Sequence, residues 1–458
     1  MSRSGYVGVT LAVAVAWLIG VADARAEEEA EEPFDQPSVL TSFGLTDLNR
    51  KAIGEAGIRW RAIYTGDLPT NLSGGISRGT TYNSRLEFGV QADLEKLTGW
   101  SGALFNVSAF AITGPGLSTV HLGNLLTVSN IEATPTVRLF ELWIEQKIGT
   151  FASLRIGQLA ADSEFITSEY AGVFINGTFG WPGIAGINLP SGGPAYPLAT
   201  PGARIELDFG GGTKFRAAIF NGDPSVPGAI DPQRANRYGT NFRLQDPPLL
   251  IAELEHAYKL GAAALPGMIK VGAWYHTGEF ADQRFDAIGL SLANPVSSGV
   301  PGLWRGDWGP YAVIDQMLMR LSPDGKRNIG GFARVSVSPD AQNLADFYFD
   351  TGINVKGLFA SRPDDVFGIA FAYAGISNRA RGLDGDIRFF TTPGYPIRDY
   401  EAVLEITYRA EIVPGWTVQP DFQYIFHPGG NVPNPNDPAM RRVVKNAAVI
   451  GVRSTMQF

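Results

Sequence analysis

Hydrophobic and polar residues alternate along most of the chain. In the last stretch, 445–458, Ile450 and Val452 fall on one side and Arg453 falls on the other. Side chains alternate between the two faces of a β-strand, so this stretch predicts a strand with one apolar and one polar face. A tilted strand of about 9–11 residues crosses a bilayer. The pattern therefore predicts a transmembrane strand between lipid and water, with a half-buried edge strand of a soluble sheet as the alternative.

Sixteen stretches carry this alternation, and turn residues separate them. Their predicted ranges are 57–65, 81–94, 102–113, 136–148, 151–162, 202–209, 213–222, 249–259, 267–278, 311–320, 328–338, 347–357, 365–377, 400–413, 416–427 and 445–458.

The connections between these stretches alternate in length. Those after even-numbered strands are short, such as 149–150 and 414–415, whereas most others are long, notably 163–201, 223–248 and 279–310. Such alternation with an even strand number is typical of bacterial outer-membrane barrels. We therefore predict an all-β, transmembrane, antiparallel up-and-down β-barrel of about 16 strands, with short periplasmic turns and long outer loops. A soluble β-sandwich or propeller is the alternative, although it would leave neither face of the sheet as a dry core.

Three segments divide the chain. Residues 1–26 have the form of a secretory signal peptide, with a small-x-small cleavage site at Ala24-Arg25-Ala26. Residues 27–56 begin as an acidic run and end in a predicted short helix, for which Thr46 is the expected N-cap. Residues 57–458 form the predicted barrel. This order predicts export, cleavage near Ala26 and insertion into the outer membrane of a Gram-negative bacterium.

Composition narrows the class of function. The formal net charge of −8 disfavours nucleic acid as a partner, because nucleic-acid binding needs a basic surface. The chain has no cysteine, which excludes disulfides and thiolate zinc sites, and its four histidines are scattered without metal-binding spacing. The sequence also contains no convincing nucleophile motif. We therefore expect a protein that is not an enzyme, with no catalytic residues, no cofactor and no metal.

The connection 163–201 is the longest, and it is the candidate for narrowing the bore. A barrel of about sixteen strands keeps an aqueous lumen, so its function depends on what occupies that lumen. Loops of this length are usually functional or disordered. This one is rich in aromatic residues between glycines and prolines, which argues for order. We expect it to fold inward as a constriction loop, with an outer loop that packs against its neighbours as the alternative.

Charged residues of both signs fall on the predicted lumen side of the strands. In 136–148 we expect Phe140 to face lipid, and Glu141, Trp143 and Glu145 to face the bore. Arginine offers a planar fork of donors and carboxylates accept several hydrogen bonds, so both suit sugar hydroxyls, while tryptophan can stack on a pyranose ring. The alternative is that these charges only neutralise one another. Other charges expected to face the bore are Arg85, Glu87, Arg155, Arg204, Glu206, Asp208, Arg216, Arg409 and Arg453.

The middle of the chain resembles a known family. Five motifs in order carry the resemblance: Arg138-Leu-Phe-Glu-Leu-Trp-Ile-Glu-Gln146, Leu154-Arg-Ile-Gly-Gln-Leu-Ala-Ala-Asp-Ser-Glu-Phe165, Phe179-Gly-Trp-Pro182, Gly193-Pro-Ala-Tyr-Pro197 and Phe220-Asn-Gly-Asp-Pro224. Together they resemble the carbohydrate-selective porins of the OprB type. The N-terminal lead-in departs from that family, because Phe43-Gly-Leu45 stands where a Trp-Gly-Gly-like element is usual.

The resemblance implies a sixteen-stranded outer-membrane barrel for passive diffusion of mono- and small oligosaccharides, without a cofactor. The implied partners are small neutral saccharides and the lipid bilayer, and the C-terminal Phe458 resembles the signal read by the outer-membrane assembly machinery. The oligomeric state, monomer or trimer, stays open. A general or structural outer-membrane barrel without sugar selectivity is the alternative function. The residues that the resemblance places at the constriction are Arg85, Glu87, Glu141, Trp143, Glu145, Arg155, Asp162, Glu164, Trp181 and Tyr196.

Overall fold

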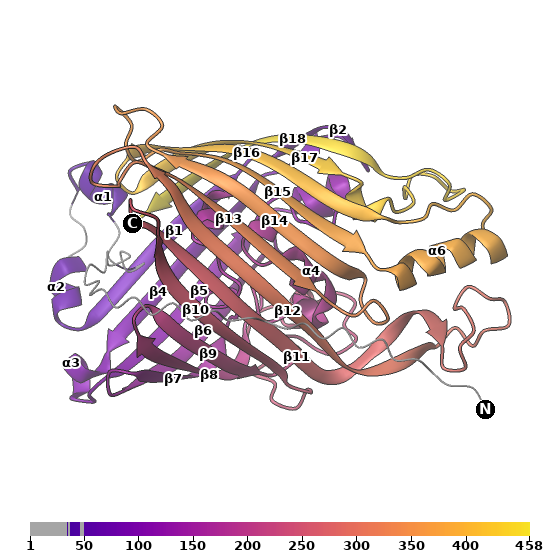
Figure 1. Cartoon of the computed structure of the whole chain (residues 1–458), viewed down its shortest axis with the longest axis horizontal. Helices are drawn as coiled ribbons and strands as arrows, with labels where there is room; N and C mark the ends of the chain where they lie inside the picture. The colour runs from indigo at the N-terminus through magenta and orange to yellow at the C-terminus, as the bar shows by residue number, and fades with distance from the viewer. Residues whose placement is uncertain (1–33, 35–36, 46–49) are drawn as a thin grey trace.

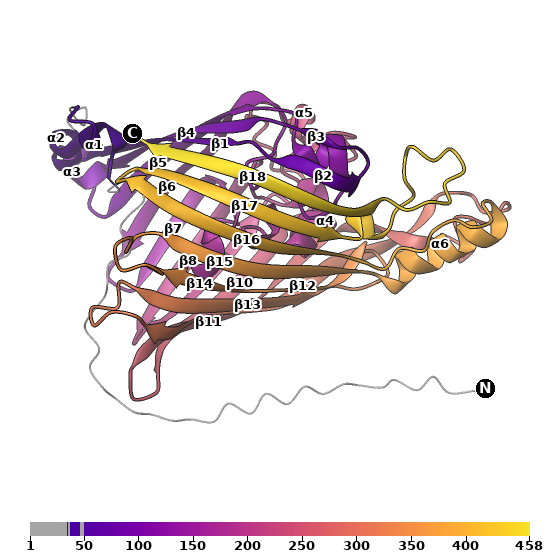
Figure 2. The ribbon, with the colours of Figure 1, turned by 90° about the horizontal axis from the view of Figure 1, so that it is seen from above.

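The strands close into an antiparallel β-barrel (Figures 1 and 2). The computed structural model describes residues 34, 37–45 and 50–458, so the predicted signal peptide and Thr46 lie outside the described residues. Sixteen strand positions, β1 and β4 to β18, surround the bore, and β1 pairs with both β4 and β18 to close the ring. Each predicted stretch coincides with one of these positions, which confirms the predicted sixteen-stranded barrel.

The strands are β1 (Ile58–Asp67), β2 (Thr70–Gly75), β3 (Gly79–Thr80), β4 (Asn83–Asp93), β5 (Ala103–Thr113), β6 (Thr136–Ile148), β7 (Ala152–Leu159), β8 (Thr200–Gly210), β9 (Thr213–Phe220), β10 (Leu249–Leu260), β11 (Leu265–Asp286), β12 (Pro301–Arg320), β13 (Asn328–Val337), β14 (Ala345–Lys356), β15 (Val366–Ile376), β16 (Tyr400–Val413), β17 (Trp416–Phe426) and β18 (Lys445–Gln457). The α-helices are short: α1 (Val39–Ser42), α2 (Arg50–Glu55), α3 (Leu94–Thr98), α4 (Gly183–Asn188), α5 (Pro232–Ala235) and α6 (Asn378–Phe390). Among the described residues, no helix is long and apolar enough to cross a membrane.

The short strand β2 extends the first strand of the barrel. It continues along β18 after β1 ends, and it pairs in turn with β3. Pro69 lies at the break between β1 and β2, where it has no N–H to donate to the sheet. The two short strands therefore add to the rim and do not change the number of strands around the bore.

The connection predicted at 279–310 is mostly strand, so that prediction is wrong in extent. Strands β11 and β12 run on beyond the barrel wall, pairing Glu279 with Arg305 and Asp286 with Pro301. Two register shifts interrupt this pairing, which disturbs the strict alternation that marks a strand in the sequence. The resulting hairpin and α6 project from the long-loop end of the barrel (Figure 1). The side chain of Arg284 on β11 joins the two elements by binding Asp386 of α6 at 2.7 and 2.9 Å.

A bulge in β6 corrects the predicted orientation of Phe140. Opposite Ser108 of β5, strand β6 carries two residues, Phe140 and Glu141, instead of one. An extra residue reverses which face the following side chains occupy. Phe140 is therefore buried inside the barrel and does not face lipid. Its ring centroid lies 4.7 Å from that of Phe110. Trp143 and Glu145 lie beyond the bulge and face inward, as predicted.

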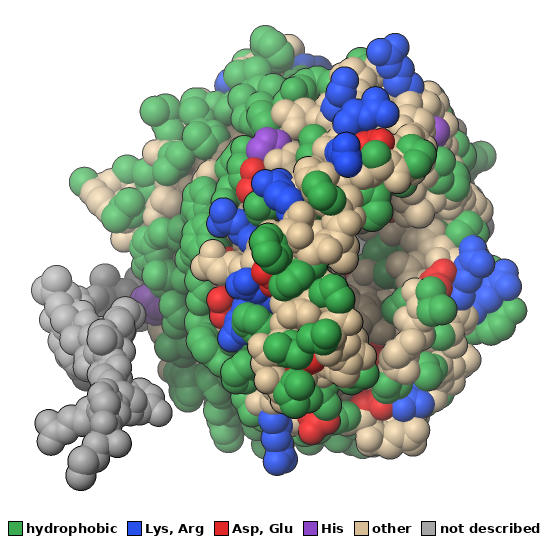
Figure 3. All heavy atoms as spheres, turned by 90° about the vertical axis from the view of Figure 1, so that its right-hand side faces the viewer, with side chains coloured by type: hydrophobic (Ala, Val, Ile, Leu, Met, Phe, Trp, Pro, Cys, Tyr) green, Lys and Arg blue, Asp and Glu red, His purple; other side chains and the backbone are tan. Residues whose placement is uncertain are grey.

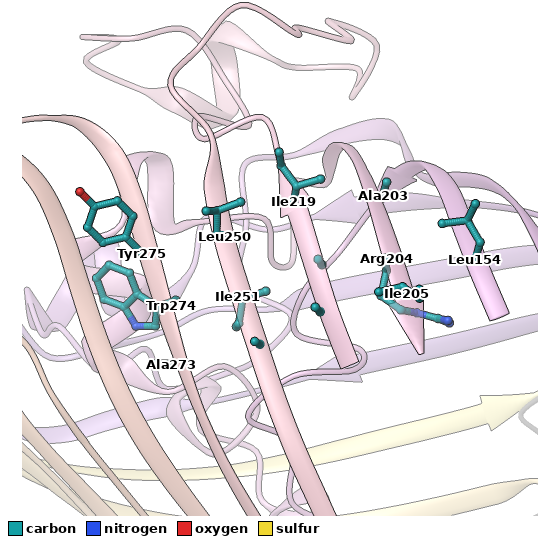
Figure 4. Close-up of a pocket in the computed structure, with 13 residues that line it drawn as sticks. Leu154, Ala203, Arg204, Ile205, Ile219, Leu250, Ile251, Ala273, Trp274 and Tyr275 are labelled. Atoms are coloured by element: carbon teal, nitrogen blue, oxygen red, sulfur yellow. The ribbon is translucent and has the colours of Figure 1, made fainter. Parts of the chain in front are cut away.

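The outer face of the barrel wall is apolar. One outward-facing groove of about 500 Å³ crosses β7 to β11 (Figure 4). Ala217, Ala252 and Ala273 pair side by side on three adjacent strands of this groove. Larger side chains, including Leu250 and Tyr275, border it. The same strands carry their charged residues at alternate positions, on the inner face. Sequence alternation thus separates a lipid-facing surface from a polar lumen.

Candidate functional site

A long loop between β7 and β8, residues 160–199, lies inside the barrel. Arg334 of β13 donates hydrogen bonds to the carbonyls of Ile166, Thr178, Phe179 and Gly180 at 2.9–3.0 Å. Glu405 of β16 accepts the N–H groups of Ile175 and Asn176 at 2.6 and 2.9 Å. These anchors stand on strands far from β7 and β8 in the ring, so the loop crosses the bore. We call residues 160–199 the inner loop.

A second connection, residues 114–135 between β5 and β6, supports the inner loop. Glu401 of β16 accepts hydrogen bonds from the N–H groups of Leu125 and Leu126. Asn176 of the inner loop donates to the Leu126 carbonyl at 3.2 Å. Sequence reasoning missed this role, although the recurrent apolar residues Leu117, Leu122, Leu126 and Val128 were a signal that this connection is buried.

Apolar packing explains why the loops stay inside. The ring centroids of Phe174 and Phe179 in the inner loop lie 5.0 Å apart, and both rings contact the ring of Phe332 on β13. Strand β15 turns mostly small residues toward them, among them Ala370 and Ala372, both nearly inaccessible to solvent. Small inward side chains leave room for the loop, and the aromatic residues fill that room at the density of a protein core. The loops thus occupy part of the bore, while a hollow remains at the loop end (Figure 3).

A polar cluster forms where the inner loop meets β6, β7 and β8. Arg155 and Arg204 stand opposite each other on β7 and β8. Glu145 lies 2.9 Å from Arg155 and 2.6 Å from Arg204, and Glu164 of the inner loop lies 2.6 and 2.7 Å from the same two guanidinium groups. Two adjacent arginines would repel each other without these carboxylates. Glu164 therefore ties the inner loop to the two arginines of the wall, and its negative charge balances part of theirs.

Further ion pairs continue this cluster around the wall to β11. Arg216 on β9 contacts Glu206 at 2.5 Å and Glu255 at 2.8 Å. Lys270 on β11 lies 3.9 Å from Glu255 and donates to Thr167 of the inner loop at 2.8 Å. Together these residues form what we call the charge ladder: Glu145, Arg155, Glu164, Arg204, Glu206, Arg216, Glu255 and Lys270.

A second polar cluster lies on the other side of β6. Glu87 of β4 is 2.6 Å from Arg61 and 3.4 Å from Arg85. The Arg85 guanidinium lies over the Tyr196 ring at 5.1 Å, and the Tyr196 N–H donates to Asp162 at 2.8 Å. This cluster joins β1 and β4 to the two ends of the inner loop.

Comparison with known proteins identifies the family. Residues 77–458 match the OprB family, described as carbohydrate-selective porins. The chain belongs to the OprB family. It is 26% identical to Porin B of Pseudomonas aeruginosa over 443 residues, which covers 90% of this chain and 92% of that protein. It is 22% identical to a protein named Putative porin QuiX of Acinetobacter baylyi over 415 residues, covering 83% of this chain and 87% of that protein.

A solved structure from the OprB family has the same fold. The high-pH structure of Pseudomonas putida OprB superposes with a TM-score of 0.80 at 22% identity, covering 93% of this chain and all of that one. This likeness supports the closed sixteen-stranded barrel. In the part of this OprB-family chain that the structure describes, no group of three or more His, Asp or Glu side chains could hold a metal ion.

The structure brings most of the predicted site residues together, in two groups. Glu145, Arg155 and Glu164 belong to the charge ladder, and Arg85, Glu87, Asp162 and Tyr196 form the second cluster. Glu141 lies between them and accepts the Ala160 N–H at 3.3 Å. Trp181 belongs to neither group, and its indole N–H donates a hydrogen bond to the Gly192 carbonyl.

The predicted tryptophan has an unexpected neighbour. Trp143 is only 6% exposed, and the Arg155 guanidinium covers its ring at 3.8 Å. Its indole N–H is buried without a hydrogen-bond partner among the described residues. A ring covered in this way is not open to a sugar unless Arg155 moves.

Several residues of the interior were missed as site residues. Arg204, Glu206 and Arg216 were expected to face inward but were not placed at the constriction, and Glu255 and Lys270 were not among the predicted site residues. Their signal was the same alternation of charged and apolar residues within one strand. The loop anchors Arg334, Glu401 and Glu405 also lie on inward positions of predicted strands, where a single charged residue was a usable signal.

Two carboxyl groups of the inner loop have opposite pKa shifts. Burial raises the pKa of Asp162 to about 6, although the Tyr196 N–H and the charge of Arg85 both oppose this shift. Burial also acts on Glu164, but there Arg155 and Arg204 outweigh it and lower the pKa. The folded loop therefore favours the protonated form of Asp162 and the ionised form of Glu164.

These shifts predict opposite pH dependences for two variants. A raised carboxyl pKa stabilises the fold below the unfolded value of about 3.9, and this contribution is lost as the pH rises through about 6. Asp162→Asn should therefore be more stable than the wild type at pH 7.5, by on the order of 1 kcal/mol, and the difference should vanish near pH 4. The unfolding temperature of the barrel, measured at several pH values, checks this.

Glu164→Gln is the matched control for that experiment. Because the pKa of Glu164 is lowered, its contribution is present above the unfolded value and is lost as the pH falls. This variant should be less stable than the wild type at pH 7.5 and approach it in acid. If both variants change with pH in the same direction, the assignment of the two shifts is wrong.

Proposed function

We propose that the protein is an outer-membrane porin through which mono- and small oligosaccharides diffuse passively. The observation that carries this proposal is the charge ladder. In it, cationic hydrogen-bond donors and carboxylate acceptors line the wall beside the inner loop. Membership of a carbohydrate-selective porin family supports the same reading. The alternative is a general or structural outer-membrane barrel without sugar selectivity.

The ladder suits a neutral solute with many hydroxyl groups. Its arginines are all paired with carboxylates, so it does not present the single-sign ring that an ion-selective pore needs. Carboxylates have several acceptor sites, and the guanidinium group has five donors. A sugar hydroxyl can both donate and accept, so it can replace water on either partner as it passes.

The inner loop is the constriction in this proposal. It brings Glu164 to the wall and places Asp162 and Tyr196 beside Arg85, so the loop and the wall supply the contact surface together. We assign hydrogen bonding to Arg85, Glu87, Glu141, Glu145, Arg155, Asp162 and Glu164. Stacking on Trp143 requires displacement of Arg155 from its ring, and Trp181 and Tyr196 act by shaping the loop.

The route to the membrane forms part of the proposal. The N-terminal segment is cleaved near Ala26, and the assembly machinery reads the C-terminal Phe458. Support comes from the position of Phe458, whose N–H donates to the Ala62 carbonyl of β1 at 2.9 Å. The C-terminus therefore lies at the seam where the barrel closes, at the end that carries the short turns.

Sugar block of a planar-bilayer current tests the function. With the purified protein, adding glucose or maltose should reduce the ion current in a saturable manner, because a bound sugar occupies the lumen. In liposome swelling, sugars should enter faster than amino acids of equal size. Conductance without any sugar block would favour a general porin, and absence of both conductance and uptake would favour a structural barrel.

Arg155→Gln tests whether the charge ladder binds the sugar. We expect the half-blocking sugar concentration to rise about tenfold, since a hydrogen bond to a charged group is worth about 1.5–3 kcal/mol. Arg284→Gln is the control, because Arg284 of β11 pairs with Asp386 of α6 at the outer end of the barrel, away from the ladder. Equal effects of the two substitutions would remove the ladder from the site.

A further inference from the structure

A chamber lies in the lumen between the inner loop and the periplasmic end. It has a volume of about 580 Å³, and Gly172 and Val173 of the inner loop form part of its lining. Gln419 of β17 fixes that boundary by donating to the Val173 carbonyl at 2.7 Å. Its remaining lining comes mainly from the short-turn ends of β1, β14, β16, β17 and β18. We call this space the periplasmic chamber.

One wall of the periplasmic chamber presents a row of hydroxyl groups. Thr417 pairs with Thr455 across β17 and β18, Thr455 pairs with Thr65 of β1, and Thr65 pairs with Arg85 of β4. All four residues line the chamber. This row connects the chamber to Arg85, which also belongs to the second polar cluster.

The cations of the chamber differ in how they are paired. Arg453 is held by Asp67 at 2.7 Å, and Arg85 lies 3.4 Å from Glu87. Arg409 and Lys356, by contrast, have no carboxylate within ion-pair distance among the residues that the structure describes. They flank Val366 on adjacent strands, so both cations occupy the same level of the wall.

Two further donors point to an acceptor that the chain does not supply. The Nε atom of Arg85 and the Nε2 atom of Gln457 are buried without a hydrogen-bond partner in the described part of the chain, and both residues line the chamber. Gln457 is only 7% exposed. A buried donor without a partner is costly, so a ligand with strong acceptor atoms would relieve it.

The acidic residues of the chamber lie nearer its mouth. Glu411 follows Arg409 by two positions along β16 toward the turn at Pro414, and Asp364 lies in the turn that precedes β15. Neither comes within ion-pair distance of Arg409 or Lys356. The excess of free donors is therefore greatest at the level of Arg409, deeper in the lumen.

We propose that the periplasmic chamber binds the oxyanion of an acidic sugar, a carboxylate or a phosphate, through Arg409 and Lys356. The threonine row and Gln457 receive the hydroxyl groups of the same molecule. This inference rests on the proposed function, and it extends the substrates from neutral sugars to polyhydroxy acids and sugar phosphates. The charge ladder, whose arginines are all paired, lacks free cations of this kind.

Block of the bilayer current by matched solutes tests the inference. Gluconate and glucose 6-phosphate should each block the wild-type current at concentrations about tenfold below that of glucose. In Arg409→Gln and Lys356→Gln, this advantage should fall about tenfold, while the half-blocking concentration of glucose stays within twofold. The two anions separate a carboxylate site from a phosphate site. High salt should weaken block by the anions and leave block by glucose unchanged.

Glu411→Gln is the control of opposite sign, because it removes a negative charge from the same chamber. It should strengthen block by gluconate.

If glucose blocks the wild type but neither anion blocks better than glucose, the chamber assignment is overturned while the sugar porin stands. If glucose does not block at all, the proposed function itself fails. If all three substitutions act on glucose and gluconate alike, they act through the structure of the lumen, and the anion site is again overturned.

Discussion

Replacing Arg334 with alanine should release the inner loop from the far wall of the barrel. The Arg334 guanidinium is almost fully buried, pairs with Asp350 and donates to four carbonyls of the loop. Alanine removes these bonds and leaves the Asp350 carboxylate buried without its partner. Loss of one partner of a buried ion pair costs roughly 3–5 kcal/mol. That cost exceeds what most single substitutions produce.

The expected result is a noisier channel with a larger mean conductance, because the loop then samples positions outside the bore. Single-channel recording measures this directly, and the unfolding temperature of the barrel reports the loss of stability. The double variant Arg334→Met with Asp350→Leu should recover much of that stability, since replacing both partners avoids the unpaired charge.

Arg284→Ala is the matched control for Arg334→Ala. It also breaks an arginine–aspartate pair, but this pair joins α6 to β11 at the outer end, and the Arg284 side chain is 33% exposed. A partly exposed pair contributes about 0–1 kcal/mol. If both substitutions change conductance equally, the Arg334 anchor does not hold the loop in the bore.

The barrel was predictable because alternation is imposed on each strand by its two surroundings. In β18, for example, Ile450 and Val452 face outward while Arg453 binds Asp67 inside. A strand between lipid and water alternates apolar and polar side chains whatever the rest of the fold is. All sixteen strand positions could therefore be predicted from local sequence, with errors at the ends.

The failures occur where that local rule is broken. The bulge at Phe140 and Glu141 reverses the faces within β6, and alternation alone does not show an extra residue. Strands β11 and β12 continue past the membrane, where lipid no longer enforces the contrast. Residues 114–135 pack inside through contacts to Glu401 and Asn176, which lie far away in the sequence.

The sequence predicts which residues of the candidate site face the lumen better than it predicts the contacts that they make there. The inward positions of Glu145 and Arg155 follow from alternation, and the structure places the two side chains 2.9 Å apart. That Arg155 also covers Trp143 depends on rotamers and on the loop above them, neither of which a linear pattern contains. The anchors Arg334 and Glu405 bind backbone groups of a loop whose path is set by tertiary packing.

Removing the middle of the inner loop should have the largest effect on conduction. Replacing residues 174–188 with a short Gly-Ser linker takes away Phe174, Phe179 and Ile184, which form part of the apolar cluster between the loop and the wall. The bore of a sixteen-stranded barrel is wide when nothing occupies it. We expect a several-fold rise in single-channel conductance and the loss of discrimination between sugars and amino acids of equal size.

Glu164 remains in this truncated variant, so the loop stays tied to Arg155 and Arg204 at its start. The control is a replacement of nearly the same length in the outer hairpin, residues 287–300, which lie between β11 and β12. That change should leave conductance as in the wild type, because the hairpin projects away from the bore (Figure 1). If the truncated inner loop gives wild-type conductance in a correctly inserted barrel, the loop is not the constriction. The narrowest part of the lumen would then be set by the wall residues of the charge ladder alone.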